Sequence, residues 1–403
     1  TIRNTVDTAG ITLQTGVGNV GISAIVALPQ NQSWNIEDTA RTLTLSGGLT
    51  GTSRTLTVND AVTNAGRLIF SGTAATMTGT LNLNEGILAF EDTGSLNSGL
   101  NVVLGTAGTA ATLKVGDTTA ATEAIIGGLS NGAFVGSKVV GGLAAISTLS
   151  IGPVGGSHTF SGALGGGGAN ENNFNLVKTG AGTQIINGAA TYSGTTIVRE
   201  GTLQLGSLST FTPAGNVSVI ANSGTTATMD FNGKNYTVVG NVTLGGGANG
   251  IAEFLDSNVT KGVITLPGNI VFDATNDPGP AVVGVNINAS GGNSIITVGD
   301  SVNAVNDLTL NGTYTVTTNN NLTFNGPGSG VVNGNISILN GTGTTKDVIF
   351  SSTGTWTINA KIEITDSISI NSGIINATVG ESLDASNDVV IDGTGTPGSA
   401  TVN

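Results

Sequence analysis

Residues 176–206 read LVKTGAGTQIINGAATYSGTTIVREGTLQLG, and this stretch decides the fold. Apolar and polar residues alternate in its short segments, as in Thr202-Leu-Gln-Leu205, and a period of two is typical of a β-strand with one buried face. We expect Tyr192 and Leu203 to face the core. Glycines recur where the chain must turn sharply, at Gly180, Gly182 and Gly194. The stretch therefore predicts short strands joined by tight corners.

Two internal repeats extend this pattern beyond the stretch. A partial copy lies near residues 66–90, where residues 76–90 align with residues 191–205 without a gap. Leu88 then aligns with Leu203, and we expect it to face the core at the equivalent place. Residues 298–313 recur as residues 379–394 at a constant offset of 81. That offset is close to four turns of a β-solenoid with about 20 residues in each turn. Repeats this scattered predict one continuous solenoid over residues 1–403.

The same alternation appears along the rest of the chain, for example at residues 42–45, 55–58 and 307–310. Asn-Gly pairs such as Asn232-Gly233 and Asn311-Gly312 lie between such segments, and we expect them to tolerate positive φ in tight turns. No long window shows the 3.6-residue apolar period of a helix. The predicted fold class is all-β, a β-solenoid built from degenerate repeats.

The composition suits a long, thin core and excludes several classes of function. Of the 403 residues, 64 are glycine, 38% are hydrophobic and 4% are aromatic, while charged residues are only 9%. An ordinary globular domain has roughly 25% charged residues. The net charge of −13 argues against nucleic acid and anionic membrane surfaces as partners. With no cysteine, disulfides, zinc thiolate sites and cysteine nucleophiles are excluded. No apolar run approaches the roughly 18 residues of a membrane helix.

Residues 176–206 closely resemble the passenger-associated transport repeat of autotransporter proteins. The pattern of that family is roughly L-x-K-x-G-x-G-T-h-x-h-x-G-x-N-T-Y-x-G-x-T-x-h-x-x-G-T-L-x-h, with h apolar, and Ala190 replaces its usual asparagine. The resemblance covers these residues and the partial copy near 66–90. It implies a right-handed parallel β-helix, export through the outer membrane, and a role in adhesion or surface structure. Because an autotransporter ends in a membrane barrel, we expect a processed passenger here, or a relative that uses the repeat in a surface layer or fibre.

The sequence assigns no catalytic, cofactor-binding or metal-binding residue, although some motifs invite such an interpretation. Residues 16–21 match G-x-G-x-x-G, with Glu37 and Asp38 near the spacing of a dinucleotide site. Glycine is so frequent that a chance match is expected, and the βαβ context is missing. His158 is the only histidine, and a catalytic triad of serine, histidine and acid would have to use it. We expect a solvated loop histidine instead.

Acidic pairs raise the questions of calcium and of sugar cleavage. Asp273-Ala-Thr-Asn-Asp277 and Asp384-Ala-Ser-Asn-Asp388 place carboxylate and amide oxygens two to four residues apart, a spacing that suits calcium, although neither completes a calcium loop. Solvated turns are the alternative. Glu37-Asp38 and Glu91-Asp92 are expected to be surface pairs rather than the acids of a glycosidase.

Arg41, Arg54 and Arg67 recur at a constant interval in similar contexts. This regularity indicates a row that binds an anionic glycan, a coincidence, or a local duplication.

Together these features predict a non-enzymatic extracellular protein of a bacterial cell surface. We expect a β-solenoid scaffold for self-assembly, as a surface layer or fibre, or for adhesion to surface glycans or to host and neighbouring cells. The alternative is a polysaccharide-active β-helix enzyme, a lyase or glycosidase. No cofactor is expected, with calcium left open, and neither nucleic acid nor membrane insertion is expected. Self-association is expected because strand-forming residues at 1–6 and 397–403 lie at solenoid ends without caps.

Overall fold

The computed structural model of this chain consists of β-strands, and its described residues contain no helix. The described residues are 2–3, 9–14, 16–37, 41–60, 65–72, 75–91, 99–116, 121–132, 136–317, 320–338, 347–378, 383–385, 389–391 and 401–402. They belong to two compact units, Thr1–Thr196 with Thr202–Ala214 and Ile197–Gly201 with Gly215–Asn403. The all-β prediction is confirmed. The prediction of one continuous solenoid over residues 1–403 stays a prediction.

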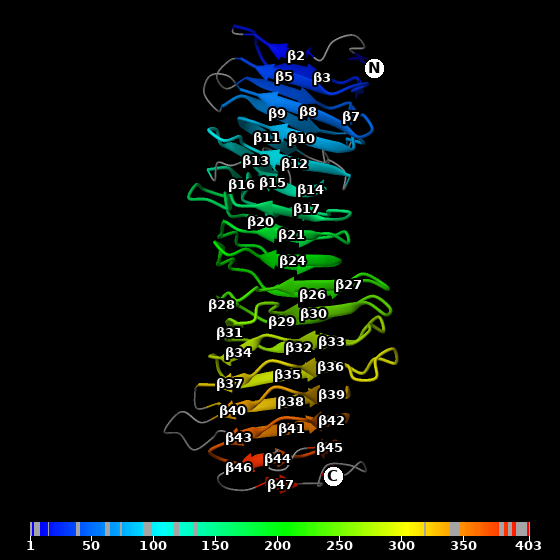
Figure 1. The fold of residues 1–403 in the computed structure, drawn as a ribbon, viewed down its shortest axis with the longest axis vertical. Coiled ribbons are helices and arrows are strands. Elements are labelled where there is room, and N and C mark those ends of the chain that lie inside the picture. Colours follow the sequence, from blue (N-terminus) through cyan, green and yellow to red (C-terminus); the bar gives the residue numbers. More distant parts are fainter. Residues whose placement is uncertain are drawn as a thin grey trace. The chain divides into compact units, whose positions relative to one another are not determined.

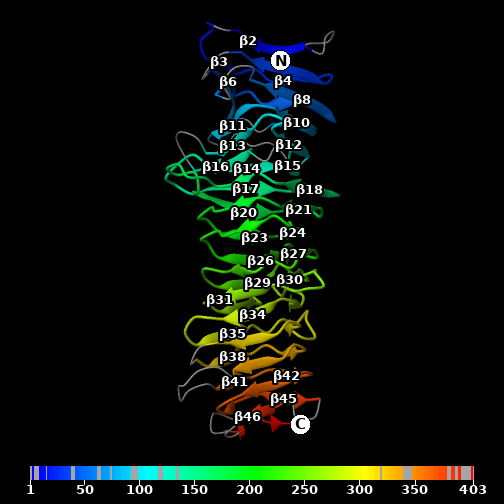
Figure 2. The same ribbon diagram turned by 60° about the vertical axis from the view of Figure 1, so that its left-hand side comes forward.

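The first unit contains parallel sheets whose strands come from successive turns (Figure 1 and Figure 2). A short sheet contains β1 (Ile2–Arg3), β4 (Val26–Ala27) and β7 (Leu49–Thr50). The β2 sheet contains β2 (Ala9–Leu13), β5 (Gln32–Ile36), β8 (Arg54–Asn59), β10 (Gly79–Leu83), β12 (Leu100–Leu104) and β15 (Leu129–Asn131). The β3 sheet contains β3 (Val20–Ile22), β6 (Thr42–Leu45), β9 (Arg67–Ser71), β11 (Gly86–Glu91), β13 (Ala111–Val115), β16 (Lys138–Gly141), β19 (Ala163–Leu164), β22 (Ala189–Ala190) and β25 (Thr210–Phe211).

Two further ladders complete the first unit. One joins β14 (Glu123–Ile126), β17 (Ser147–Ile151) and β20 (Phe174–Lys178). The other joins β18 (Ser157–Phe160), β21 (Thr183–Ile186) and β24 (Gly201–Leu205). The strand β23 (Thr196–Val198) lies where the sequence divides between the units.

The second unit repeats a three-strand turn, and each strand of a turn belongs to a different sheet. The β26 sheet contains β26 (Val217–Ala221), β29 (Val242–Gly246), β32 (Ile270–Asp273), β35 (Ser294–Val298), β38 (Leu322–Gly326), β41 (Val348–Ser352), β44 (Ile368–Ile370) and β47 (Val389–Ile391). The β27 sheet contains β27 (Thr226–Asp230), β30 (Ile251–Leu255), β33 (Ala281–Val283), β36 (Leu308–Leu310), β39 (Gly330–Val332), β42 (Thr355–Ile358), β45 (Ile374–Ala377) and β48 (Thr401–Val402). The β28 sheet contains β28 (Tyr236–Thr237), β31 (Val263–Leu266), β34 (Asn286–Ala289), β37 (Tyr314–Val316), β40 (Ile336–Ile338), β43 (Ile362–Ile364) and β46 (Leu383–Ala385).

Each unit is thus a parallel β-solenoid, as the repeats predicted. A strand pairs with the strand one turn later, but the length of a turn varies. Thr183 pairs with Thr202 across a short turn, whereas the turn that separates Val242 from its partner Ile270 is considerably longer. Because the strands keep their register while the turns differ, the connecting loops absorb the difference in length.

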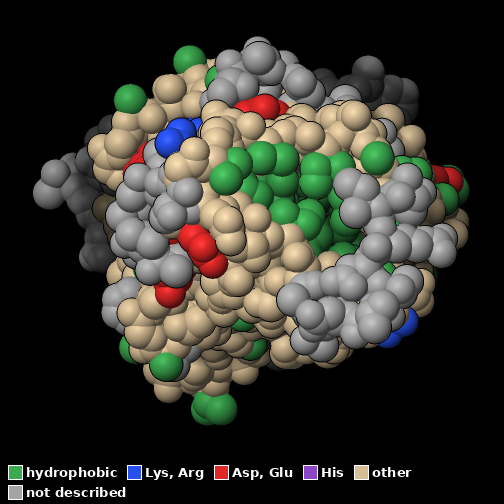
Figure 3. All heavy atoms as spheres, turned by 90° about the horizontal axis from the view of Figure 1, so that it is seen from above, with side chains coloured by type: hydrophobic (Ala, Val, Ile, Leu, Met, Phe, Trp, Pro, Cys, Tyr) green, Lys and Arg blue, Asp and Glu red, His purple; other side chains and the backbone are tan. Residues whose placement is uncertain are grey.

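The core follows from the alternation along each strand. In β10, Leu81 and Leu83 are buried while Thr80 and Asn82 are half-buried on the other side. Side chains of the same type from successive turns stack on one another. The rings of Phe324 and Phe350, for example, lie 4.7 Å apart and nearly parallel. Figure 3 views the first unit from its N-terminal end and shows hydrophobic side chains gathered in the middle, surrounded by backbone and other side chains.

Asparagine side chains form ladders along the outside of each unit. In the first unit, Asn59 Nδ2 donates to Asn35 Oδ1 at 2.9 Å, and Asn84 Nδ2 donates to Asn59 Oδ1 at 2.7 Å. In the second unit, Asn333 Nδ2 donates to Asn311 Oδ1 at 2.8 Å. These residues lie one turn apart, so each amide satisfies the next one along the solenoid. This ladder explains much of the asparagine between the strands.

The Asn-Gly pairs play two different roles. Asn232 and Gly233 have φ of 47° and 78°, as predicted for a tight turn. Asn311 joins the ladder instead, and neither it nor Gly312 has a positive φ. A Cβ at Gly312 would clash with the carbonyl oxygen of Val285, so glycine is required there for close approach of the backbones.

The 81-residue offset does not equal four turns, and that expectation is wrong. From Leu308 in the β27 sheet, three turns lead to Ile375, and a fourth leads to Val402. The residue aligned with Leu308 by the offset is Val389, which falls between these two positions and lies in the β26 sheet. Residues 379–382, 386–388 and 392–394 of the second copy lie outside the described residues.

The better-matching repeat also lies differently from its partial copy. In residues 66–90, the strands β10 and β11 belong to the β2 and β3 sheets. In residues 176–206, β24 aligns with β11 but pairs with β21 rather than with a strand of the β3 sheet. The predicted core positions hold in both copies, because Tyr192, Leu203 and Leu88 are all fully buried.

Candidate functional site

A polar depression of about 400 Å³ lies on the outside of the β2 sheet in the first unit. Its lining comes from β2, β5, β8 and the residue before β5, and it consists of uncharged hydrogen-bonding residues: Thr12, Asn31, Gln32, Ser33, Asn35, Thr55 and Thr57. We call these residues the polar pocket. Strands that alternate buried and outward side chains produce it, because every second residue of β5 and β8 points away from the core.

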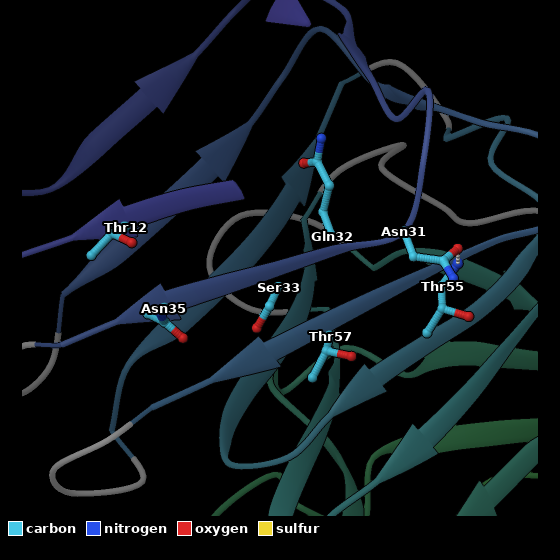
Figure 4. A pocket seen from close by; sticks show the side chains of 7 residues that line it. All are labelled: Thr12, Asn31, Gln32, Ser33, Asn35, Thr55 and Thr57. Atoms are coloured by element: carbon cyan, nitrogen blue, oxygen red, sulfur yellow. Dashed lines mark hydrogen bonds between the residues drawn. The ribbon is translucent and has the colours of Figure 1, made fainter. Parts of the chain in front are cut away.

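Some side chains of the polar pocket hold the neighbouring turns together. Asn31 Oδ1 accepts a hydrogen bond from the backbone N–H of Thr55 at 2.9 Å, and Figure 4 shows these two residues side by side. Ser33 Oγ and Asn35 Oδ1 both accept from Asn59 Nδ2. Gln32 points away from the other side chains in Figure 4, and its Oε1 accepts from Trp34 Nε1 in the core.

These internal bonds leave hydrogen-bonding capacity on the outside. The amide Nδ2 groups of Asn31 and Asn35 are donors beside oxygens that are already used, and a serine or threonine hydroxyl both donates and accepts. The hydroxyl groups of Thr55 and Thr57 project from adjacent outward positions of β8. The pocket therefore offers directed hydrogen bonds without any charge, which suits a neutral, hydroxyl-rich ligand.

The structure also locates the motifs that the sequence analysis raised. Residues 16–21 begin with Gly16, at a φ of 84°, and lead into the strand β3. A dinucleotide site needs a helix N-terminus at this point, so this segment lacks the element that binds the pyrophosphate. Glu37 directly follows β5, and Asp38 lies outside the described residues.

His158 is a strand residue rather than the solvated loop residue that the sequence analysis expected. It lies in β18 and is half-buried, and burial lowers the pKa of its imidazole. A Cβ at Gly128 would clash with the imidazole ring, so the ring packs directly over this glycine. His158 therefore fills the space beside β15.

A buried amide completes the structure around His158. Gln184 is fully buried, its Oε1 accepts from the backbone N–H of Leu129 at 3.0 Å, and its Nε2 donates to the carbonyl of Leu129 at 2.9 Å. The same Nε2 lies 3.2 Å from the carbonyl oxygen of His158. The backbone groups of Leu129 are thus satisfied by a side chain from two turns later.

Of the described carboxylates considered for calcium, Asp384 Oδ2 lies 2.8 Å from Lys361 Nζ, and Asp273 and Asp277 are directed at backbone amides. Asp273 Oδ1 accepts from the N–H of Thr275 at 2.9 Å, and Asp277 Oδ1 accepts from the N–H of Val302 at 2.8 Å. No group of three or more His, Cys, Asp or Glu side chains that could hold a metal occurs among the described residues. Calcium binding stays a prediction. Residues 386–388 of the second motif, and Asp92 of the Glu91-Asp92 pair, lie outside the described residues.

The three arginines do not form one row. The backbone N–H of Arg67 donates to the carbonyl of Arg41, so these two lie on adjacent turns beside the β3 sheet. Arg54 begins β8 in the β2 sheet. The interval between successive arginines is shorter than a full turn, and they therefore alternate between sheets.

The polar pocket and the buried Lys178 were not predicted from the sequence. The polar pocket was hidden because its threonines and asparagines resemble those of every other strand. Lys178 is fully buried, and its Nζ donates to the carbonyl oxygens of Thr179 and Gly180 at 2.7 and 2.6 Å. A lysine shortly before a turn glycine was the available signal for this structural role.

The comparisons with known proteins identify the repeat. The family model described as passenger-associated-transport-repeat matches residues 62–90 and 176–205. No curated protein and no solved structure matches the chain. The described part of the chain has no helix long and apolar enough to cross a membrane. The chain therefore contains two passenger-associated transport repeats within a parallel β-solenoid, and it is similar to the β-helix of an autotransporter passenger.

Proposed function

We propose that this chain is a non-enzymatic adhesive scaffold on a bacterial cell surface, and that the polar pocket binds neutral glycans. The transport repeats suit a passenger that is secreted to the cell surface. The observation on which the proposal depends is the lining of the polar pocket, which combines hydroxyl and amide groups with no charged side chain. Sugars offer the complementary hydroxyl groups, and neutral hydrogen bonds discriminate among them by direction.

A binding role agrees with the way the described carboxylates are used. Asp230 Oδ1 accepts from the N–H groups of Asn232 and Ser257, and Asp307 bonds the N–H groups of Ser301 and Ser329. Such acids hold successive turns together and do not form a pair across a groove, as cleavage of a glycosidic bond requires. Passengers with this repeat are usually non-catalytic. The self-association expected of residues 1–6 and 397–403 depends mostly on residues outside the described ones and stays a prediction.

The test measures binding of neutral oligosaccharides to the parent chain and to a T55V/T57V double variant. Valine keeps the β-branched shape of threonine and removes the hydroxyl. Because each neutral hydrogen bond contributes about 0.5–1.5 kcal/mol, the double variant should bind roughly tenfold more weakly in calorimetry. T309V, at a half-buried outward position of β36, is the matched control. Absence of binding to neutral glucans, mannans and N-acetylglucosamine oligomers would overturn the proposal, as would parent-like binding by T55V/T57V.

A further inference from the structure

A second depression, of about 320 Å³, lies on the outside of the β3 sheet and is separate from the polar pocket. Its floor comes from β11, β13 and β16, and its wall comes from the glycine-rich loop at residues 165–173. We call it the lysine groove, and the residues that matter are Ile87, Lys114, Lys138, Val140, Gly168 and Glu171. The registers Thr112↔Lys138 and Lys114↔Val140 place the two lysines on neighbouring strands, in adjacent outward rows.

The wall of the groove is a built structure. Gly166 N donates to Asn172 Oδ1, and Asn172 Nδ2 returns a bond to the carbonyl of Gly166, both at 3.0 Å. The backbone N–H of Gly141 in β16 donates to the carbonyl of Glu171 at 2.9 Å, which ties the loop to the sheet. The loop therefore holds Glu171 in a fixed position over the two lysines.

Two glycines of the lysine groove, Gly142 and Gly168, lie against Lys114 and Glu171. A Cβ at Gly142 would lie 2.9 Å from Cε of Lys114, and a Cβ at Gly168 would lie 3.0 Å from Cδ of Glu171. The Lys114 and Glu171 side chains could shift to relieve these contacts, but a Cβ at Gly142 would also clash with the carbonyl oxygen of Gly116. Glycine at position 142 is therefore required for the close approach of the two backbones at the edge of the groove.

The charges in the groove favour an anion. Lys138 Nζ lies 2.6 Å from Glu171 Oε1, so Lys138 binds a carboxylate within the groove. Burial, followed by the charge of Arg67, lowers the pKa of Lys114, while Glu171 and Glu91 act in the opposite direction. The bond from Lys138 lowers the pKa of Glu171 and keeps it ionised. A ligand carboxylate beside Lys114 would add to the attraction from Glu171 and Glu91 and offset the repulsion from Arg67.

We infer that the lysine groove binds the carboxylate of an acidic sugar, with Lys114 and Lys138 as its cations and Glu171 as a built-in competitor. The volume lies at the lower end of ligand pockets, which suits one or two sugar units. Ile87 offers a half-buried apolar surface to the C–H face of a sugar ring, and the lysines take its carboxylate. The inference does not depend on the polar pocket, whose ligand is neutral.

The test is calorimetric titration of the full chain with trigalacturonate, with free galacturonate and with the neutral maltotriose. We expect trigalacturonate to bind, free galacturonate to bind more weakly, and maltotriose not to bind in the groove. K114Q should reduce the affinity for trigalacturonate at least tenfold, because it removes a charge-assisted hydrogen bond. E171Q should raise the affinity several-fold, because Lys138 loses its internal carboxylate. A merely structural role for Glu171 predicts a loss of affinity instead.

The matched control is K361Q, because Lys361 also pairs with carboxylates, Glu363 and Asp384, but lies in the second unit. It should bind trigalacturonate like the parent, and all variants are compared by circular dichroism to establish that they fold. Equal binding by K114Q and the parent would overturn the inference. Inorganic phosphate is titrated as well, and binding of phosphate as tight as that of trigalacturonate would also overturn it. T55V/T57V should leave trigalacturonate binding unchanged, so failure of this inference and failure of the neutral-glycan proposal are distinguishable.

Discussion

The two transport repeats bury different chemistry at the same two positions. In residues 176–205 these positions hold Tyr192 and Thr196, and Tyr192 Oη lies 2.6 Å from Thr196 Oγ1. In residues 62–90 they hold Met77 and Leu81, and all four side chains are fully buried. The two hydroxyl groups of the polar pair satisfy each other, and the apolar pair needs no such bond. The repeat thus specifies which positions are buried and leaves open what fills them.

The two copies also differ in the sheets that they join. The aligned strands β11 and β24 belong to different ladders, although Leu88 and Leu203 occupy equivalent buried positions in them. One copy of the repeat therefore encodes the geometry of about one turn. It does not determine the side of the solenoid on which that turn begins.

The largest expected effect comes from a charge at the shared core position. Leu88→Asp and Leu203→Asp should each destabilise the chain by roughly 3–5 kcal/mol, because each buries an unpaired carboxylate. Urea unfolding followed by circular dichroism measures the loss. Thr80→Asp and Thr202→Asp, at half-buried outward positions, should cost far less. If both leucine variants unfold like the parent, the alignment of the two copies is wrong.

The next largest effect is expected at the pair Tyr192 and Thr196, where a substitution should cost more stability than at the aligned apolar pair Met77 and Leu81. Tyr192→Phe should cost about 1–3 kcal/mol, because it leaves the hydroxyl of Thr196 buried without its partner. The Y192F/T196V double variant removes both groups and should recover most of that loss. Met77→Leu, at the aligned position, should cost less than about 1.5 kcal/mol. Additive effects of Y192F and T196V would show that the two hydroxyl groups do not interact.

A smaller effect is expected at the aligned turn glycines. Gly86 and Gly201 have φ of 85° and 65°, so an alanine at either position adopts the left-handed region at a cost of about 1–2 kcal/mol. Gly86→Ala should be the more damaging, because its Cβ would also lie 2.6 Å from the carbonyl oxygen of Gly66. Thermal unfolding of the two variants ranks them. Equal stability of Gly86→Ala and the parent would contradict the shared turn.

The smallest effect is a pH dependence in the earlier copy. Burial, followed by the charge of Asp60, raises the pKa of Glu85 above its ordinary value of 4.5. A raised folded-state pKa stabilises the protein below the unfolded pKa, and this contribution is lost as the pH rises through the folded value. Glu85→Gln should therefore flatten the change in stability as the pH rises from about 4 towards neutrality. An unchanged pH profile in this variant would show that Glu85 does not contribute.

The sequence predicted the fold and the core because both depend on local patterns. Alternation within each short segment placed Tyr192, Leu203 and Leu88 in the core, and the repeats predicted a solenoid. The lysine groove could not be predicted in the same way, because Lys114 and Lys138 become neighbours only when β11, β13 and β16 pair across successive turns.

The variable length of a turn explains why residues on adjacent turns could not be matched from the sequence. It differs between the pairings of β21 with β24 and of β29 with β32, so no constant spacing in the sequence marks residues that lie side by side on adjacent turns. The same variation explains why the 81-residue offset does not equal four turns.

Gln184 has a consequence for how the first unit opens. In an ideal solenoid each turn contacts only its neighbours, so coupling between turns extends one step at a time. The two bonds from Gln184 to Leu129 reach across the intervening strand β18. Elsewhere a single turn can fray by itself. Around Gln184, however, β15, β18 and β21 must separate together. The amide hydrogen of Leu129 should therefore exchange with solvent only when β21 separates, and its exchange rate reports on a strand two turns away.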